Sequence, residues 1–202
     1  LFDGVTYPLS ENWQKPLRDC GELYAGIDIG HKHDRTTLWV WEKVGSIYFQ
    51  RKLLVMQGMK FSEQEAQIYP ILALPNLRRA CIDATGLGAQ FAERAQERFG
   101  KYRIEDVFFT NAVKEDMAYK LRAAFEDRNI RIADDRETRA DFRSIKKEIT
   151  SSGKIRFDAD RTEAIGHGDR FWGAALALYA ASSQSGESYI EQIPIDRTSR
   201  MM

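Results

Sequence analysis

The order of apolar patterns along the chain constrains its fold more than any other feature of the sequence. Residues 23–30, 36–41 and 46–56 are short runs rich in apolar, β-branched and aromatic side chains, and Gly45 separates the last two. Runs of this kind, bounded by turn residues, are typical of β-strands. We therefore predict a three-stranded antiparallel meander with a charged loop over residues 31–35 after its first strand.

Beyond the meander the apolar residues change their period. Residues 61–73 and 87–99 have helical spacing, and each segment is followed by a strand-like run, at 79–83 and 104–109. Alternating helices and strands imply parallel strands with crossovers, so the whole pattern predicts a mixed α/β sheet flanked by helices. We also expect helices over 111–128, 135–147 and 163–181, and a hairpin over 150–157 that turns at residues 151–153.

The size and charge of the chain limit its organisation. Its 202 residues are enough for one sizeable core, and we predict a lead-in or linker over 1–22, one domain over 23–181 and a flexible tail over 182–202. The 30 basic and 30 acidic residues cancel, which excludes the strongly basic surface of a dedicated nucleic-acid-packing protein. Any nucleic-acid binding must therefore depend on local patches.

The remaining composition excludes several other classes. The sequence contains no apolar run near the length of a membrane span and no basic-then-apolar leader, so we expect an intracellular protein without a membrane anchor. Only two cysteines are present, Cys20 and Cys81, and they lack zinc-ligand spacing. A disulfide framework is accordingly not expected.

Three aspartates occupy positions where a negative charge is expensive. Asp28 interrupts the apolar run 23–30, and Asp83 ends the run 79–83 at the edge of the sheet where open α/β proteins place ligands. Asp169 shares a helix face with Trp172 and Leu176, which is the packing face of that helix. Each acid also has a structural interpretation, as a strand-end cap, a turn anchor or a helix-dipole partner respectively.

Convergence of these three carboxylates would be repulsive without a cation. Hard oxygen ligands without cysteine favour Mg²⁺ or Mn²⁺, and a cluster of this kind can hold two ions for phosphodiester cleavage. We therefore predict that Asp28, Asp83 and Asp169 form a metal site, with Asp34 either a supporting ligand or an ordinary turn residue.

Two other sites remain possible on the residues alone. The three histidines, His31, His33 and His167, all lie beside these acids, so a zinc or iron site stays open. The pair Gly86 and Gly88 matches only part of a dinucleotide-binding loop, and the chain contains no P-loop motif. This chain is therefore not expected to hydrolyse ATP by the P-loop route.

The order of elements and acids resembles the ribonuclease H-like nuclease fold. Within it, the chain resembles the C-terminal nuclease domain of tailed-phage terminase large subunits. The segments that carry the resemblance are Gly26-Ile-Asp-Ile-Gly30, residues 34–40, residues 81–88, Lys114 to Phe125 leading into 129–132, and residues 166–177. The last is the most specific, because a small residue before Asp169, followed by an aromatic and alanine-rich helix, recurs in that family.

The resemblance implies an endonuclease, dependent on two Mg²⁺ or Mn²⁺ ions, that cuts concatemeric viral DNA during packaging. It assigns Asp28, Asp83 and Asp169 to the metal ligands, with Asp34 in support. Many relatives have Glu at the second position, so Asp83 shortens the reach of that ligand. It also implies an ATPase domain before residue 1, a portal and a small terminase subunit as partners, and a location in the cytoplasm of a bacterial host.

Basic residues near the acids and the hairpin are candidates for contact with double-stranded DNA. They are Lys32, Arg35, Arg143, Lys146, Lys147 and Lys154, with Arg156 in the same stretch. A mixed-charge surface is also often no more than a solvated face. Four alternatives remain open: a Holliday-junction resolvase, a transposase-type nuclease, a non-catalytic module that docks DNA or a portal, and half of a sugar-kinase-like or actin-like ATPase.

Overall fold

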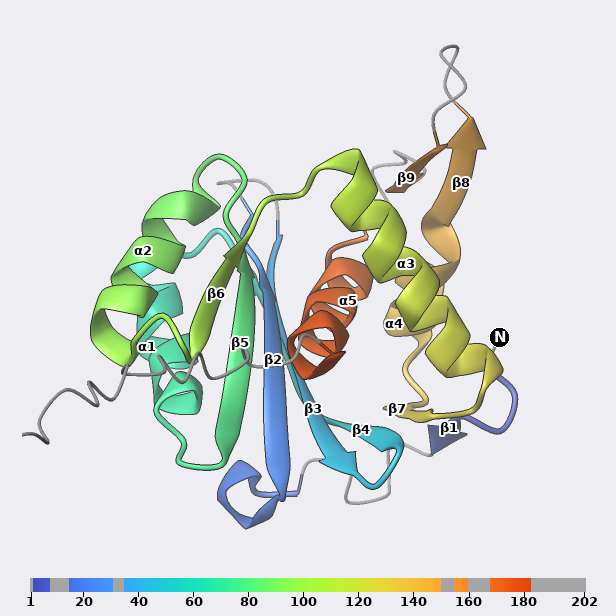
Figure 1. The fold of residues 1–202 in the computed structure, drawn as a ribbon, viewed down its shortest axis with the longest axis horizontal. Coiled ribbons are helices and arrows are strands. Elements are labelled where there is room, and N and C mark those ends of the chain that lie inside the picture. The colour runs from blue at the N-terminus through green and yellow to red at the C-terminus, as the bar shows by residue number, and fades with distance from the viewer. Residues whose placement is uncertain (1, 8–14, 31–34, 150–154, 160–167, 183–202) are drawn as a thin grey trace, which may run out of the picture.

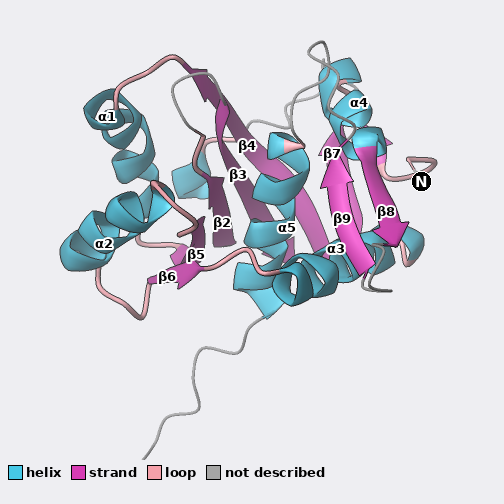
Figure 2. Cartoon of the chain, turned by 90° about the horizontal axis from the view of Figure 1, so that it is seen from above, coloured by secondary structure: helices cyan, strands magenta, loops and turns pink. Residues whose placement is uncertain are grey.

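The computed structural model describes residues 2–7, 15–30, 35–149, 155–159 and 168–182. They form a seven-stranded mixed sheet with strand order β1-β7-β4-β3-β2-β5-β6 and a separate two-stranded sheet of β8 and β9. Helices cover both faces of the large sheet, α1 and α2 on one and α3 and α5 on the other (Figures 1 and 2). The predicted mixed α/β class is confirmed.

The antiparallel meander forms the centre of the sheet, as predicted. Strands β2 (Glu22–Asp28), β3 (Arg35–Val44) and β4 (Ile47–Gln57) pair in sequence order. The β3–β4 turn places Gly45 at φ 60°, a left-handed conformation that glycine adopts without steric cost. Leu38 and Val40 face one side of the sheet and Trp39 and Trp41 the other, so the meander supplies both cores.

Parallel strands extend the meander on both sides. Helix α1 (Phe61–Leu72) leads to β5 (Leu77–Asp83), and α2 (Gly88–Phe99) leads to β6 (Ile104–Val107). On the other side, α3 (Asn111–Glu126) leads to β7 (Ile130–Ala133), which pairs parallel with β4. Because β2, β5 and β6 run parallel, their carboxyl ends meet at one edge of the sheet.

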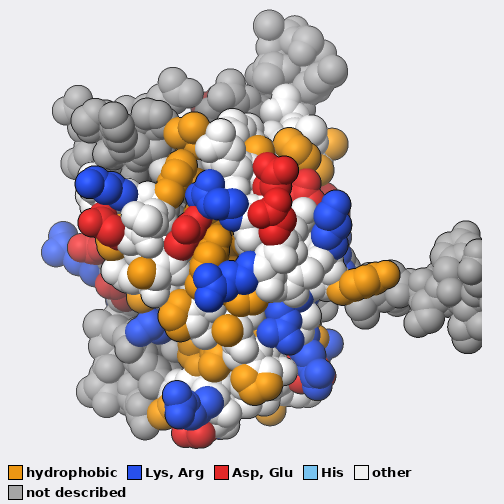
Figure 3. Space-filling view, turned by 90° about the vertical axis from the view of Figure 1, so that its left-hand side faces the viewer, with side chains coloured by type: hydrophobic (Ala, Val, Ile, Leu, Met, Phe, Trp, Pro, Cys, Tyr) orange, Lys and Arg blue, Asp and Glu red, His pale blue; other side chains and the backbone are white. Residues whose placement is uncertain are grey.

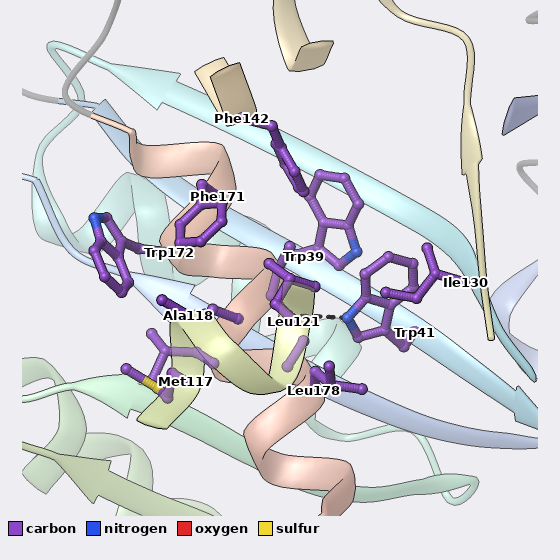
Figure 4. Close-up of a cluster of buried hydrophobic side chains, with 14 of the residues drawn as sticks. Trp39, Trp41, Met117, Ala118, Leu121, Ile130, Phe142, Phe171, Trp172 and Leu178 are labelled. Carbon is purple, nitrogen blue, oxygen red and sulfur yellow. Dashed lines mark hydrogen bonds between the residues drawn. The ribbon is translucent and has the colours of Figure 1, made fainter. Parts of the chain in front are cut away.

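The two faces of the sheet differ in their packing. Aliphatic side chains dominate the core under α1 and α2, whereas the core under α3, α4 and α5 is rich in aromatic rings (Figure 4). Trp41 Nε1 donates to the carbonyl oxygen of Ala174 at 3.0 Å and so ties β3 to α5. On the outer surface of the α1–α2 side, positive and negative side chains are interspersed with apolar ones (Figure 3).

The prediction that the fourth helix continues to residue 147 was wrong. Helix α4 spans only Arg136–Ser144, and Ile145–Ile149 forms β8, which pairs antiparallel with β9 (Ile155–Ala159). The segment has an isoleucine at each end and three charged residues between them, and its pairing with β9 outweighs the local helical spacing. Lys146 and Lys147 therefore lie on a strand.

The two ends of the chain complete the fold. The segment predicted as a lead-in contains β1 (Thr6–Tyr7), which pairs with β7, and a short 3₁₀ turn at Leu17–Asp19. Phe2 and Val5 are buried in the aromatic core, so the start of this segment packs with the domain. Helix α5 is described over Asp169–Ser182; the predicted helical residues 163–167 and the predicted tail beyond it lie outside the described residues.

Candidate metal centre

Asp28 and Asp83 end adjacent parallel strands. The last paired residues of β2 and β5 are Ile27 and Ile82, so the next residue of each strand is an aspartate. Asp28 shares a sheet face with Gly26, and Asp83 shares the same face with Cys81, because side chains two residues apart point to one side. That face is the one that α5 covers.

A close contact between two backbones brings Asp169 to the same edge. A Cβ atom on Gly26 would lie 2.1 Å from the carbonyl oxygen of Gly173, so β2 and α5 approach more closely than any side chain permits. Asp169 lies one helical turn before Gly173 and on the same helix face. The glycine contact therefore places Asp169 over the end of β2, beside Asp28.

Asp141 is a fourth acid at this edge, and the sequence analysis did not identify it. The residue lies on α4 with 6% of its surface exposed, and its Oδ2 accepts a hydrogen bond from the backbone N–H of Arg170 at 2.7 Å. Its Oδ1 is buried without a hydrogen-bond partner. One carboxylate oxygen thus holds the start of α5, while the other is unsatisfied. We call Asp28, Asp83, Asp141 and Asp169 the carboxylate cluster.

The environment of the cluster opposes ionisation. Burial raises the pKa of Asp28 well above its ordinary value of 3.8, and the charges of Asp169, Asp83 and Asp141 raise it further. Burial likewise raises the pKa of Asp83, although hydrogen bonds from Thr85, including one from its backbone N–H to Oδ1 at 2.9 Å, counteract this. The pKa of Asp141 is also raised by burial, against its hydrogen bonds from the Arg170 and Gly168 backbone.

The charge of Lys114 moderates this repulsion at Asp28 and Asp83. Lys114, on the first turns of α3, lowers the pKa of both Asp28 and Asp83. Its ammonium lies over the rings of Trp172, at 4.6 Å from the centroid, and Phe109, at 5.2 Å. The sequence analysis quoted Lys114 only within a longer segment. Its position in the first turn of the helix that follows β6, a strand that ends at the ligand edge, was the signal that could have identified it.

The donor set fits a hard divalent cation. The cluster offers only oxygen ligands, repels itself when ionised and leaves one buried carboxylate oxygen unsatisfied. Within the described ranges, no three His, Cys, Asp or Glu side chains form a ready-made cage for one ion. A Mg²⁺ ion bound here would accordingly take one or two carboxylates and keep several waters.

Several predicted site residues lie elsewhere or outside the description. Lys32, Asp34, Lys154 and all three histidines are outside the described residues, as is the side chain of Arg156. Arg35 begins β3, and its charge acts on Asp141. Two other basic candidates contact aromatic side chains: Arg143 lies over the Phe2 ring, and Lys147 donates to the Tyr119 hydroxyl at 2.9 Å. Lys146 is exposed on β8.

A comparison with known proteins defines the family. Residues 25–181 match the model of the terminase RNaseH-like domain, so this chain belongs to that family. It is 32% identical over 146 residues to the probable terminase large subunit gp28 of Escherichia phage Mu, and 28% identical over 127 residues to the terminase ATPase subunit of Escherichia phage P2. These alignments cover 71% and 60% of this chain but only 25% and 21% of those proteins.

Solved structures show the same fold. The large terminase nuclease of thermophilic phage G20c, determined with bound magnesium, matches with a TM-score of 0.64 at 22% identity over 78% of this chain and 80% of that one. The large terminase of a second thermophilic bacteriophage matches with a TM-score of 0.65 at 13% identity, over 87% of this chain and 41% of that longer one. Together with the family match, these structures confirm the predicted ribonuclease H-like fold. No helix among the described residues is long and apolar enough to cross a bilayer.

Proposed function

We propose that this chain is a divalent-metal-dependent endonuclease domain that hydrolyses phosphodiester bonds of double-stranded DNA during the packaging of a phage genome. The observation that carries the proposal is the convergence of Asp28, Asp83 and Asp169 at one sheet edge, with the pKa of Asp28 raised by burial and by the other two acids. A carboxyl whose pKa is raised by burial and by neighbouring acids is a candidate ligand site, because a bound cation would relieve the same repulsion.

The residues of the chain have separable roles in this proposal. Asp28, Asp83 and Asp169 would hold one or two Mg²⁺ or Mn²⁺ ions, with Asp34 in support. Bound there, the ions would supply Lewis acidity and neutralise charge on the phosphate. Asp141 holds the first turn of α5 through the Arg170 backbone N–H and so orients Asp169.

The orientation of two helices also favours negative charge at the carboxylate cluster. Helix α3 begins after β6 ends, helix α5 begins at Asp169 itself, and both lie on the face of the sheet that holds the cluster, so their positive dipole ends lie toward the acids. The field of these helix ends favours negative charge, whether from the carboxylates or from an incoming phosphate.

The solved structures support a divalent metal, and the name of one relative supports an ATPase domain in the same subunit. The G20c nuclease has been determined with magnesium, with cobalt and with zinc, which supports a divalent ion here. The P2 relative is named an ATPase subunit, and this chain spans about a quarter of the curated relatives it matches. We therefore place the domain in a large subunit that includes an ATPase domain and works with a portal and a small subunit in the bacterial cytoplasm.

Plasmid cleavage tests the proposal directly. The purified chain with Mn²⁺ is expected to nick or linearise supercoiled plasmid, and Asp28→Ala is expected to abolish this. Asp106→Ala is the matched control, because Asp106 is an exposed acid on β6 that accepts a hydrogen bond from Gln96 at 2.8 Å. Cleavage restricted to four-way junctions would instead support a resolvase. DNA binding without cleavage at any Mn²⁺ or Mg²⁺ concentration would support a docking module.

A further inference from the structure

Lys114 lies at the end of α3 that is nearest the carboxylate cluster. Its helix starts at Asn111, with the Thr110 side chain accepting from the Val113 N–H at 3.2 Å, so Lys114 belongs to the helix end nearest the acids. The charge of Lys114 acts on Asp28 and on Asp83, the two acids that end neighbouring strands. A lysine on the outer face of α3 would act on neither.

Two aromatic rings hold the Lys114 ammonium in place. The Phe109 and Trp172 rings lie 5.5 Å apart, and the ammonium lies over both. One ring comes from the loop that leads into α3 and the other from α5, three residues after Asp169. A cation held by ring faces keeps its N–H groups available, because the interaction is with the π-system and does not use a hydrogen-bond acceptor.

The ammonium does not form a conventional ion pair with the cluster. It makes no hydrogen bond, and no ion pair within 4.0 Å, with any other residue in the described part of the chain. The carboxylate oxygens of Asp28 and Asp83 are therefore not occupied by it. Its charge lies close to the cluster, while the ligand atoms stay available.

The positive charge of Lys114 would be unfavourable beside a bound divalent cation, so its position requires an explanation. Bound Mg²⁺ or Mn²⁺ would repel Lys114, so the lysine weakens metal binding unless an anion lies between the two charges. A phosphate is such an anion: its non-bridging oxygens accept from ammonium and metal alike, and lysine is a common phosphate ligand.

We propose that Lys114 is a substrate-binding residue whose ammonium contacts a non-bridging oxygen of the DNA phosphate that enters the carboxylate cluster. This inference rests on the function proposed above and names a contact in the same site. The alternative is a purely structural role, in which Lys114 only offsets the repulsion of the acids while no metal is bound.

The two roles predict opposite results for Lys114→Met. As a phosphate ligand, Lys114 is needed at saturating Mn²⁺, and its removal should lower the cleavage rate there about 100-fold, the typical loss for one donor to a developing oxyanion. As a structural counter-charge it is dispensable at saturating Mn²⁺, and Lys114→Met would tighten Mn²⁺ binding and cleave at the wild-type rate. The second pattern would overturn the proposal.

DNA binding supplies a readout that does not require cleavage. With a short fluorescein-labelled duplex in Ca²⁺, Lys114→Met should weaken binding and reduce the slope of log K against log salt by about 0.9, the value for one lost phosphate contact. Lys114→Arg keeps the charge and can stack on the same rings, so it should restore most of the affinity. An unchanged salt slope in Lys114→Met would contradict the inference even if the chain does not cut DNA.

The same helix contains a matched control. Lys120 lies over the Tyr179 ring at 5.4 Å and pairs with Asp116 at 2.7 Å, so it is also a ring-bound lysine of α3. Lys120→Met should leave cleavage, Mn²⁺ affinity and the salt slope unchanged. If the wild-type chain fails to cut plasmid, the proposed function fails. If it cuts and the Lys114 and Lys120 variants behave alike, only the inference about Lys114 fails.

Discussion

The ladder between β2 and β3 has an acid near each end, Glu42 buried and Asp28 half-buried, and the protein treats the two charges in opposite ways. Near one end, Glu42 is 3% exposed and accepts from the Gly21 N–H at 2.6 Å and from Arg51 Nε at 2.6 Å. Burial alone would raise the pKa of Glu42, but these hydrogen bonds and the Arg51 charge lower it overall. At the other end, Asp28 interacts mainly with other carboxylates, and its pKa is raised.

This difference separates an acid with a structural role, Glu42, from an acid that we propose as a metal ligand, Asp28. The protein itself supplies the donors and the cation that Glu42 requires, so no ligand is needed at that end of the ladder. At the cluster the protein supplies the charge of Lys114 and donors to Asp83 and Asp141, but these do not outweigh burial, and the pKa values of Asp28, Asp83 and Asp141 stay raised. Burial of a charge by itself therefore indicates little, whereas burial without compensation indicates a ligand site.

The largest expected effect is a loss of unfolding free energy when a Cβ atom is added to β2 near Asp28, compared with the same change near Glu42. In Gly26→Ala the new Cβ would lie 2.1 Å from the Gly173 carbonyl oxygen, so β2 and α5 must separate, and we expect a loss of about 3 kcal/mol or more in unfolding free energy. In Gly21→Ala the Cβ would lie 3.5 Å from Glu42 Oε1, an ordinary contact. Urea unfolding of both variants checks the contrast, and equal losses would show that the close contact does not position α5.

An intermediate effect is expected from metal binding. If the cluster binds Mn²⁺ in the folded state only, free Mn²⁺ at roughly 100 times its Kd should stabilise the chain by about 2.7 kcal/mol. Asp28→Asn should reduce this gain, whereas Glu42→Gln should keep it, because Glu42 is already neutralised by its protein partners. Thermal melts with and without Mn²⁺ measure both. A gain that survives in Asp28→Asn would place the metal elsewhere.

The smallest effect concerns pH in the absence of metal. The pKa of Glu42 is depressed, so its contribution to stability is present above its ordinary value of 4.5 and is lost as pH falls through its folded-state pKa. The pKa of Asp28 is raised, so its contribution is complete below 3.8 and is lost as pH rises through its folded-state pKa. Glu42→Gln should thus cost about 2 kcal/mol at neutral pH, the typical value for hydrogen bonds to a charged group.

Asp28→Asn should change the free energy of unfolding with the opposite sign at neutral pH. It should remove the loss of stability that develops above pH 3.8 and leave the metal-free chain more stable than wild type at neutral pH. Unfolding free energies across the range from acid to neutral pH test both signs. If the metal-free Asp28→Asn variant were less stable than wild type at neutral pH, the proposed contrast between Asp28 and Glu42 would be wrong.

Much of this architecture was predictable because it is encoded locally. The meander, the alternation of helices and strands and the parallel extension of the sheet follow from short periodic patterns, and they are confirmed. The boundary at Ser144 was not predictable, since β8 exists through pairing with β9 and helical spacing alone continued through Lys147. The partners of Arg143 and Lys147 depend in the same way on distant rings, Phe2 and Tyr119.

The sequence by itself determined the mixed sheet, its order of elements and the three aspartates that occupy costly positions, because strand and helix periods and isolated charges in apolar runs are properties of neighbouring residues. Only the tertiary structure decided that Asp141 joins the edge, that Gly26 and Gly173 bring Asp169 over β2, and that Lys114 lies over two rings beside the acids. Those facts depend on contacts between segments remote in the chain. A pattern within one segment contains no information about which charge another segment will place beside it.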